Sequence, residues 1–409
     1  MSLRNDLSFA GFDLLAPLHT DGVPMFVRGN RASYFTSEGK EYVDLNEMRV
    51  VLGQRNEAFD KAMAEAGNAL TSTRGINSAK AELFRYLDTT TEGLFTAAHL
   101  SVSGSESVEN AVRLAKKLTG RTEIISFWNS IHGRTYLSAS MSGLPRRKAR
   151  YGPLAGGVIH FPYPNCAKCP LQKDRAACNM ACLTLAKDIY ASSSAQDAAA
   201  VVVELCQANG VVLPPPGYMR ALQGWAKSCG MLFIVDEMQS GMGRSGQMYL
   251  YQMEGLEPDI LLLGKALGNG RHISAMLVRE VPAKEDLAIY SGGSGDDPVA
   301  CRAACEVFRQ LEDGLLHHVR ETGALLTDGL KTLEDSPLVL ESRGIGLSAA
   351  VEFYDAAVCD MVCAALLEQG FLPGQAGSVL FCKPPYVITQ EQIRGFLQAL
   401  RHILDNLVQ

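Results

Sequence analysis

The chain has 409 residues, of which 47% are hydrophobic and 20% are charged, and its formal net charge is −6. A chain of this length folds most simply as one large and one smaller domain. The negative charge disfavours a nucleic-acid partner, and apolar runs such as residues 231–235 are too short to span a bilayer. Eleven cysteines, with no signal-peptide pattern over residues 1–21, predict reduced thiols and a cytoplasmic location.

Short apolar runs alternate with helical patterns through the middle of the chain. A helix is predicted after Ser103-Gly104-Ser105, and another from Gly217 to Gly230. The runs that are typical of buried strands are residues 123–128, 158–161, 199–205, 231–235 and 260–263. This alternation predicts an α/β fold with a mostly parallel sheet covered by helices, whose ligands bind at the carboxyl ends of the strands.

The C-terminal part has a different pattern. Residues 345–353 and 379–382 are predicted to be strands, and Thr389 with Gln392 forms a capping box before an amphipathic helix. We therefore expect two domains and a separate N-terminal segment. The predicted divisions are an N-terminal segment, 1–45, that packs on the small domain or on a partner subunit, a large domain, 46–299, and a small α/β domain, 300–409.

Two of the predicted strands are followed by residues with complementary chemistry. Asp236 closes the run at 231–235, and Lys265 follows the run at 260–263. Pyridoxal 5′-phosphate (PLP) needs such a pair, because a lysine holds its aldehyde as a Schiff base and a carboxylate keeps its pyridine nitrogen protonated. The sequence therefore predicts PLP as the cofactor, with Lys265 also moving the proton during the reaction.

A third segment suits the cofactor's phosphate. Gly104 and Ser105 open a predicted helix, where free backbone N–H groups and the helix dipole favour an anion. An ordinary serine cap has the same appearance, so this prediction depends on the Asp236 and Lys265 segments.

Taken in order, these segments resemble the class III (ω-)aminotransferases, PLP enzymes of fold type I. The resemblance covers most of the chain and is closest to the branch of the 4-aminobutyrate transaminases and isoleucine 2-epimerases. It implies a homodimer with active sites at the subunit interface. The segments that carry it are 103–106, 132–135, Glu204, 214–218, Asp236, Lys265, 297–298, 343–344, 384–385 and the cysteine-containing insert 166–182.

The resemblance implies further contacts with PLP. Met238 matches the side chain packed under the ring, and Gln239 matches the residue that bonds the phenolic oxygen. Ile131 and His132 match the pair that covers the outer face, although many relatives have a stacking aromatic residue where this chain has Ile131. In many relatives a threonine of the neighbouring subunit binds the phosphate. Here Gly293 stands at that position, and Ser294 is the candidate for the hydroxyl.

The resemblance also points to the substrate. Arg134 matches an arginine that receives the carboxylate remote from the amine, although a structural ion pair is the equal alternative. Glu204 matches an acid that relatives pair with a second arginine, which binds an α-carboxylate. Phe381 stands at the position of that arginine, and the nearest cation is Lys383. We therefore expect poor binding of α-carboxylates, and we expect Glu204 to face a substrate amine.

Three functions are compatible with these residues. The first is an aminotransferase that moves an amino group from an ω-amino acid or another amine to a carbonyl acceptor. The second is a racemase, an epimerase or a decarboxylating transaminase of the same family, because racemisation needs no second carboxylate site. The third is a non-catalytic PLP-binding protein, which the presence of both Lys265 and Asp236 disfavours.

Three other motifs have weaker implications. The cysteines of the insert have spacing that suits either a tetrahedral metal site or a thiol-rich packed segment, and we predict no metal. The basic run 146–150 is predicted to lie on a solvated surface or at the mouth of the site. Gly344-x-Gly346 lies inside a predicted strand and is not interpreted as a nucleotide-binding loop. The four cysteines are Cys166, Cys169, Cys178 and Cys182.

Overall fold

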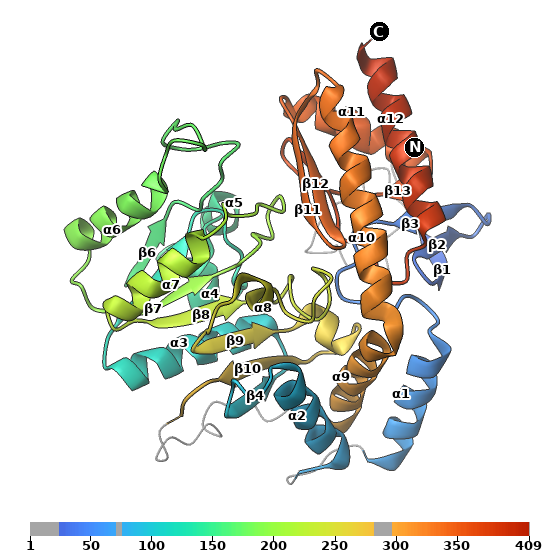
Figure 1. Ribbon diagram of the computed structural model, residues 1–409. Coiled ribbons are helices and arrows are strands. Elements are labelled where there is room, and N and C mark those ends of the chain that lie inside the picture. The colour runs from blue at the N-terminus through green and yellow to red at the C-terminus, as the bar shows by residue number, and fades with distance from the viewer. Residues whose placement is uncertain (1–23, 71–75, 282–296, 409) are drawn as a thin grey trace.

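The computed structural model describes residues 24–70, 76–281 and 297–408. Figure 1 shows a larger body around a seven-stranded sheet and a smaller one around a four-stranded sheet. The α/β arrangement and the mostly parallel large sheet confirm the predicted fold class. The helices are α1 Glu57–Ala69, α2 Ser78–Thr90, α3 Gly104–Thr119, α4 Tyr136–Met141, α5 Pro145–Lys148, α6 Ala181–Ser193, α7 Tyr218–Ser228, α8 Leu250–Glu254, α9 Pro298–Gln310, α10 Leu316–Lys331, α11 Ala356–Glu368 and α12 Gln390–Val408.

The large sheet has the strand order β4-β10-β9-β8-β7-β5-β6. The predicted strands at 123–128, 158–161, 199–205, 231–235 and 260–263 are all present, and they pair in parallel. β4 and β10 were not predicted, and β10 runs antiparallel to both of its neighbours. The bounds are β4 Ala97–Ser101, β5 Glu123–Phe127, β6 Val158–Phe161, β7 Ala198–Val203, β8 Leu232–Asp236, β9 Ile260–Leu263 and β10 Ser274–Val278.

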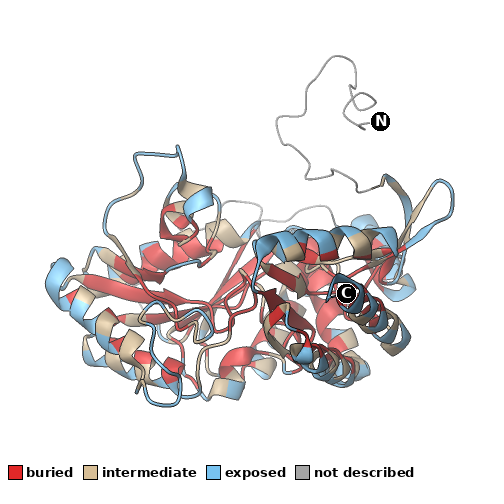
Figure 2. Cartoon of the chain, turned by 90° about the horizontal axis from the view of Figure 1, so that it is seen from above, coloured by how far each residue is buried: buried red, intermediate tan, exposed pale blue. Residues whose placement is uncertain are grey.

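The large sheet is buried on both faces, which explains why its strands are continuous apolar runs. Val201 and Val235 belong to one hydrophobic core cluster, whereas the adjacent Val202 and Ile234 belong to the other. Successive side chains of a strand point to opposite faces, so the two clusters fill the two sides of the sheet. The buried face of α3 packs in the second cluster. Figure 2 shows the strands as the buried interior of this body.

The small body contains an antiparallel sheet in the order β11-β12-β15-β14. The predicted strand at 345–353 is wrong in one respect, because Ile345 ends β11 and β12 begins only at Ser348. Between them Gly346 has φ +55°, and a Cβ atom there would lie 2.4 Å from the carbonyl oxygen of Arg244. Only glycine fits this hairpin turn. The bounds are β11 Val339–Ile345, β12 Ser348–Phe353, β14 Gly374–Ala376 and β15 Val379–Cys382.

The predicted helix at the C-terminus is confirmed as α12. The Thr389 hydroxyl accepts a hydrogen bond from the backbone N–H of Gln392 at 3.1 Å, and the Gln392 side chain accepts one from the N–H of Thr389 at 3.0 Å. This is the predicted capping box. Residues of one face of the helix, including Ile393, Phe396 and Leu400, are buried.

The N-terminal strands form a third sheet, in the order β1-β2-β3-β13, which joins them to the C-terminal part of the chain. β13 pairs in parallel with β3. α9 packs against α1 and α2, whereas α10 packs against β11 and α12, so the chain passes between the two bodies at Leu311–Leu315. These contacts favour a boundary later than residue 299, and the three-part division remains a prediction. The bounds are β1 Phe26–Asn30, β2 Ser33–Thr36, β3 Glu41–Asp44 and β13 Phe371–Leu372.

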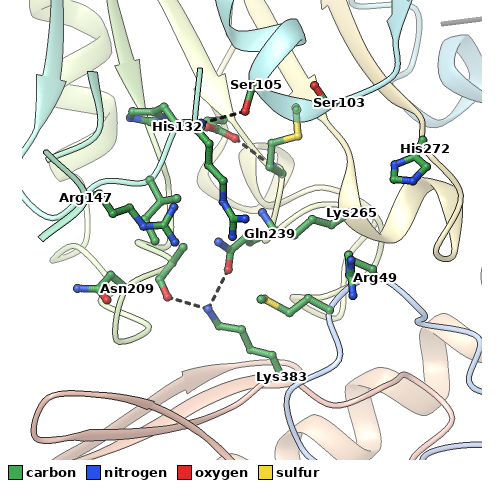
Figure 3. Close-up of a pocket in the computed structure, with 18 of the residues that line it drawn as sticks. Arg49, Ser103, Ser105, His132, Arg147, Asn209, Gln239, Lys265, His272 and Lys383 are labelled. Atoms are coloured by element: carbon green, nitrogen blue, oxygen red, sulfur yellow. Dashed lines mark hydrogen bonds and ion pairs between the residues drawn. The ribbon is translucent and has the colours of Figure 1, made fainter. Parts of the chain in front are cut away.

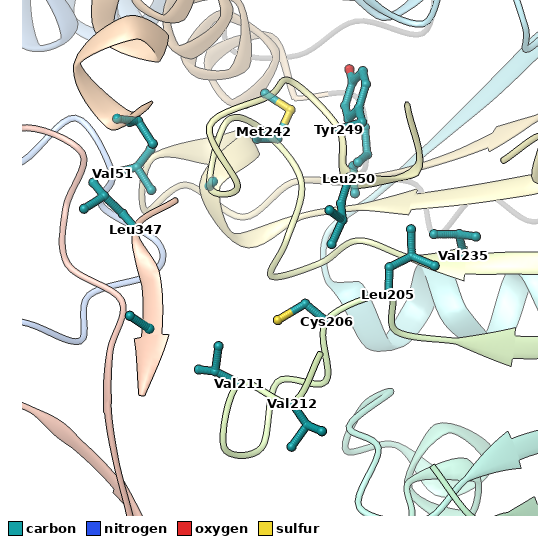
Figure 4. Packing of buried hydrophobic residues seen from close by; sticks show 14 of the residues in the cluster. Val51, Leu205, Cys206, Val211, Val212, Val235, Met242, Tyr249, Leu250 and Leu347 are labelled. Carbon is teal, nitrogen blue, oxygen red and sulfur yellow. The ribbon is translucent and has the colours of Figure 1, made fainter. Parts of the chain in front are cut away.

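The two bodies share one hydrophobic cluster. Leu205 and Val235 of the large body belong to the same buried cluster as Val51 and Leu347 (Figure 4). Leu347 directly precedes β12 of the small body. Of the helices in the described ranges, none has both the length and the apolar character needed to cross a bilayer.

Candidate active site

A cavity of about 510 Å³ lies at the carboxyl ends of the large sheet's strands (Figure 3). Asp236, the last residue of β8, and Lys265, which follows β9, both line it. The N-terminal part of the chain contributes Met48 and Arg49, and the small body contributes Phe381. Residues far apart in sequence therefore meet at the sheet edge where the strand pattern predicted a ligand.

Asp236 is held on both carboxylate oxygens. Its Oδ2 lies 2.7 Å from Nδ1 of His132, and its Oδ1 accepts the backbone N–H of Met238 at 3.1 Å. Burial disfavours the protonated imidazole, but the hydrogen bond to Asp236 and its charge outweigh this effect and raise the pKa of His132. The imidazole therefore holds the Asp236 carboxyl group in place, as the partner of a pyridinium must be held.

This contact changes the interpretation of His132. Its side chain is buried, and one ring nitrogen is engaged with Asp236. The geometry favours His132 as the residue that orients Asp236 over the predicted role of covering the face of the ring. Ile131 lines the cavity, and its predicted contact with the face of the ring stays a prediction.

Lys265 has a strained backbone conformation and an amine whose pKa is lowered. Its φ is +40°, a left-handed conformation that is costly for a residue with a side chain. Burial lowers the pKa of the amine, although Asp236 and Glu204 partly oppose this effect. A lowered pKa leaves more of the amine unprotonated, which is the form that attacks a carbonyl.

Met238 occupies a slot between two glycines. A Cβ atom on Gly104 would lie 2.8 Å from its sulfur, and one on Gly264 would lie 2.5 Å from it. The backbone at Gly104 and Gly264 therefore lies so close to Met238 that no side chain larger than a hydrogen fits at either position. This close packing fits the predicted role of Met238 as the support under the cofactor ring.

The first turn of α3 borders the cavity at Gly104 and Ser105. The Ser103 hydroxyl accepts the backbone N–H of Glu106, so it caps the helix. The Ser105 hydroxyl accepts the backbone N–H of Arg134 at 3.0 Å and keeps its own hydrogen for another acceptor. A helix N-terminus with these donors suits the phosphate of PLP. Ser294 and Gly293 lie outside the described residues.

Gln239 is oriented by a buried lysine. The Nζ atom of Lys383 donates to Oε1 of Gln239 at 3.0 Å and to the carbonyl oxygen of Ala208 at 2.8 Å. Burial lowers the pKa of Lys383 to about 8. Because the amide oxygen of Gln239 is engaged, its amide nitrogen is the group left to serve an acceptor such as a phenolic oxygen.

Glu204 lies behind the cavity wall. Its carboxylate accepts the backbone N–H of Ile131 at 3.0 Å and of Ala208 at 3.2 Å, and burial raises its pKa to about 7. It is absent from the described residues that line the cavity, whereas Phe381 is among them. The geometry favours a structural role for Glu204, and its predicted contact with a substrate amine remains a prediction.

Several cavity residues had no signal in the sequence. Asn209, His272 and Gln375 line the cavity, but nothing in their local pattern marks them. Arg147 belongs to the basic run that was expected at a surface or at the mouth of the site, and Arg147 and Arg146 both line the cavity.

The cysteine insert forms a separate small feature. Its four cysteines border a narrow cavity together with Tyr163 and Met180, and all four are free thiols. Within the described ranges, no group of three or more metal-binding side chains has the arrangement of a metal site.

The residues present fit PLP. A lysine with a lowered pKa, a buried carboxyl group held by His132 and a helix N-terminus border one cavity. The packing of Met238 against two glycines supplies a floor for a flat ring.

Comparison with known proteins points the same way. The profile of the aminotransferase class-III family matches residues 19–404. An acetylornithine aminotransferase of Mycobacterium leprae is 32% identical over 399 residues, which cover 94% of this chain and 92% of that protein. One from Methanopyrus kandleri is 33% identical, with 93% of each chain covered. A thermostable 6-fold mutant of an omega transaminase from Pseudomonas jessenii superimposes with a TM-score of 0.89 at 25% identity, over 97% of this chain and 96% of that one.

Proposed function

We propose a specific reaction for this chain from the premise that it belongs to the class III aminotransferase family. It is accordingly a PLP-dependent aminotransferase of fold type I, acting on small amines and carbonyl acceptors. The hypothesis of a non-catalytic binding protein is set aside. The proposal concerns the residues that perform the reaction and the kind of amine that the cavity accepts.

We assign the cofactor roles as follows. PLP, when bound, supplies the aldehyde that captures the amine and the ring that withdraws electrons. Lys265 holds that aldehyde between turnovers, and its amine then moves the proton as base and acid. Asp236, oriented by His132, keeps the ring nitrogen protonated. Gly104 and Ser105 bind the phosphate, and Met238 and Gln239 contact the ring and its phenolic oxygen.

The observation that carries the substrate proposal is the surface around Phe381. Phe381 lines the cavity where the family resemblance leads us to expect an arginine, and a phenyl ring cannot bind a carboxylate. The nearby Lys383 is engaged with Ala208 and Gln239, and the Glu204 carboxylate is engaged with backbone N–H groups. We therefore propose that the reacting carbon of the amine carries no carboxylate and that Arg134 receives an anionic group at the far end of the substrate.

The finer placement of the chain is also a proposal. The 132–135 segment and the cysteine insert support a position near the 4-aminobutyrate transaminase and isoleucine 2-epimerase branch. We propose a homodimer with active sites at the interface, which the family resemblance supports. Eleven cysteines, all free, support a reducing compartment such as the cytoplasm.

A racemase or epimerase is the second candidate, and a decarboxylating transaminase belongs to the same alternative. The observation in favour of racemisation is again Phe381, because that reaction returns the proton to the same carbon and needs no site for a second acid. Deuterium from solvent would then enter the substrate without net amine transfer.

The test is the visible absorption of the PLP-loaded protein during addition of 4-aminobutyrate, diamines, amino sugars, branched amino acids and L-glutamate. We expect the band of the lysine-bound cofactor to be lost with ω-amines and to persist with glutamate. Rapid loss with glutamate would contradict the role given to Phe381. A band that shifts and recovers would favour the racemase.

Phe381→Arg sharpens this test. If the missing guanidinium causes the discrimination, L-glutamate converts the cofactor of this variant at least about tenfold faster than that of the wild type. This factor corresponds to the free energy of one hydrogen bond to a charged group. Phe381→Leu is the matched control, because it opens space without adding charge. Equal gains in both variants would show that space, rather than charge, had excluded glutamate.

A further inference from the structure

Among the arginines that line the cavity, Arg134 and Arg147 are the two whose charges act on Lys265. Arg134 follows β5 and Arg147 lies in α5, and both line the cavity. In each of them the backbone N–H donates a hydrogen bond, to Ser105 and to Leu144 respectively. Their guanidinium groups make no hydrogen bond or ion pair within the described ranges. Figure 3 shows Arg147 on one side of the cavity and Arg49 on the other.

The two guanidinium groups border the same cavity, and their like charges oppose one another. Burial lowers the pKa of Arg147, and the charges of Arg134 and Arg146 lower it further. The charges of Arg147 and Arg134 also contribute to the lowered pKa of Lys265. Like charges held together in a partly desolvated place raise the free energy of the empty site, and an anion relieves that cost when it binds.

The cavity itself offers no such anion. Asp236 is the one acidic residue among the described residues that line it, and both of its oxygens are already engaged. The first turn of α3 provides a separate place for the phosphate of PLP. Arg146 and Arg271 also line the cavity, but Arg134 and Arg147 are the pair whose charges act on Lys265, and we assign this pair to the substrate.

The number of guanidinium groups determines how many negative charges the bound anionic group should carry. A single carboxylate has two oxygens, which one guanidinium can bind in a bidentate manner. A second guanidinium beside it then remains without a partner. A phosphonate or phosphate group has three oxygens and two negative charges, and a pair of carboxylates has four oxygens and two charges. Either of these groups satisfies both arginines.

We propose that the substrate amine ends in a doubly charged anionic group, which Arg134 and Arg147 bind together at the end remote from Lys265. This inference rests on the proposed function and narrows its substrate class. It distinguishes the chain from an enzyme for amines with a single distal carboxylate, for which Arg134 alone would be sufficient.

The first experiment compares amines of similar length on the PLP-loaded protein. Butylamine, 4-aminobutyrate and 3-aminopropylphosphonate carry zero, one and two distal charges at mildly alkaline pH, and kcat/KM is measured from the loss of the visible band. We expect 3-aminopropylphosphonate to exceed 4-aminobutyrate by about tenfold to a hundredfold. An ω-amine ending in a malonate tests whether two carboxylates substitute for the phosphonate. A preference for 4-aminobutyrate over both doubly charged amines would overturn the proposal.

The second experiment uses Arg147→Met and the matched control Arg150→Met. Arg150 belongs to the same basic run but is exposed and does not line the cavity. We expect the phosphonate-to-butylamine ratio of kcat/KM to fall by about tenfold or more in Arg147→Met and to keep its wild-type value in Arg150→Met. Arg147→Lys restores part of the ratio, since it keeps the charge and loses the bidentate geometry. An equal fall in both Met variants would overturn the proposal.

Two measurements distinguish a substrate site at Arg147 from a cofactor site. The affinity for PLP is determined for each variant, because a large loss in Arg147→Met would assign that arginine to the cofactor phosphate and overturn the proposal. Propylphosphonate, which has no amine, is titrated as a non-reacting ligand. Binding that is lost in Arg147→Met supports the anion site even if no amine reacts, so the proposed function can fail independently. Equal binding by wild type and Arg147→Met would overturn the inference.

Discussion

The cavity has two regions with opposite electrostatic organisation. At the strand ends, the carboxyl group of Asp236 has partners, because it bonds His132 and the N–H of Met238. In the connection between β5 and β6, Arg134 and Arg147 have no side-chain partner in the described structure. The paired region rests on buried strands, and the unpaired region rests on short helices and loops. Groups that act on every substrate are thus fixed by the sheet, while groups that select a substrate stand where sequence can change freely.

The largest effect is expected from the paired region. Lys265→Ala removes both the attachment point and the proton carrier, so the rate of amine transfer falls by about 10³-fold or more. PLP should still bind, because Asp236 and the first turn of α3 are unchanged, but its visible spectrum becomes that of the free aldehyde. Single-turnover kinetics and absorption check this result. A variant that retains the wild-type spectrum would show that another lysine carries the cofactor.

His132→Phe tests whether the partner of Asp236 is essential. It leaves a buried carboxylate unpaired, which costs about 3–5 kcal/mol of unfolding free energy. Because Asp236 raises the pKa of His132 above 6.5, the stabilisation is complete below that pH and is lost as the pH rises through the raised pKa. The difference in Tm between the two apoproteins should therefore shrink with increasing pH. A difference that is constant from acid to alkaline pH would contradict a charged pair.

Gly264→Ala tests the floor of the paired region. The added Cβ would lie 2.5 Å from the sulfur of Met238, so Met238 must move, at a cost of about 1–3 kcal/mol. We expect weaker PLP binding as well as a lower Tm. Gly224→Ala is the matched control, since nothing lies within 4 Å of its added Cβ in α7. If the two substitutions have equal effects, the packing of Met238 is looser than the structure implies.

Lys383→Met tests a buried lysine that bonds Gln239 but lies at neither the strand ends of the large sheet nor the arginine pair. We expect the smallest effect on activity from this substitution. Without Lys383 the amide of Gln239 loses its fixed orientation, so the cofactor band shifts and kcat falls by about tenfold or less. Since the pKa of Lys383 is about 8, its charge is present below that pH. The difference between wild type and variant should be largest below pH 8 and smaller above it, where the neutral amine still donates to Gln239 but carries no charge. Lys383→Arg should retain most of the wild-type spectrum.

The sequence predicted the paired region better than the unpaired one. Asp236 and Lys265 follow apolar runs that are buried on both faces, and that pattern alone places them at one edge of a parallel sheet. The contact between His132 and Asp236 had no local signal, because the two residues lie 104 positions apart and meet only through the strand order.

The other points at which the structure departs from the sequence-based predictions also depend on how segments pack in three dimensions. Arg147 belongs to a basic run that also suits a solvated surface, and only the position of α5 brings it to the cavity. The hairpin at Gly346 was predicted as one strand, since its apolar residues continue across the turn. The floor around Met238 depends on two glycines that are far apart in the chain, Gly104 and Gly264.

The pairing of β13 with β3 has a consequence for the order in which the protein can be made. Phe371 is the partner of Val43, so β3 leaves the ribosome long before the strand that completes its sheet exists. Met48 and Arg49, just after β3, then form a wall of the cavity. Domains generally fold from the N-terminus during synthesis, and contacts between distant segments form late. The wall of the cavity formed by Met48 and Arg49 is therefore completed only when the last part of the chain has been translated. Nascent chains that stop before β13 would carry Lys265 and Asp236 without an enclosed cavity.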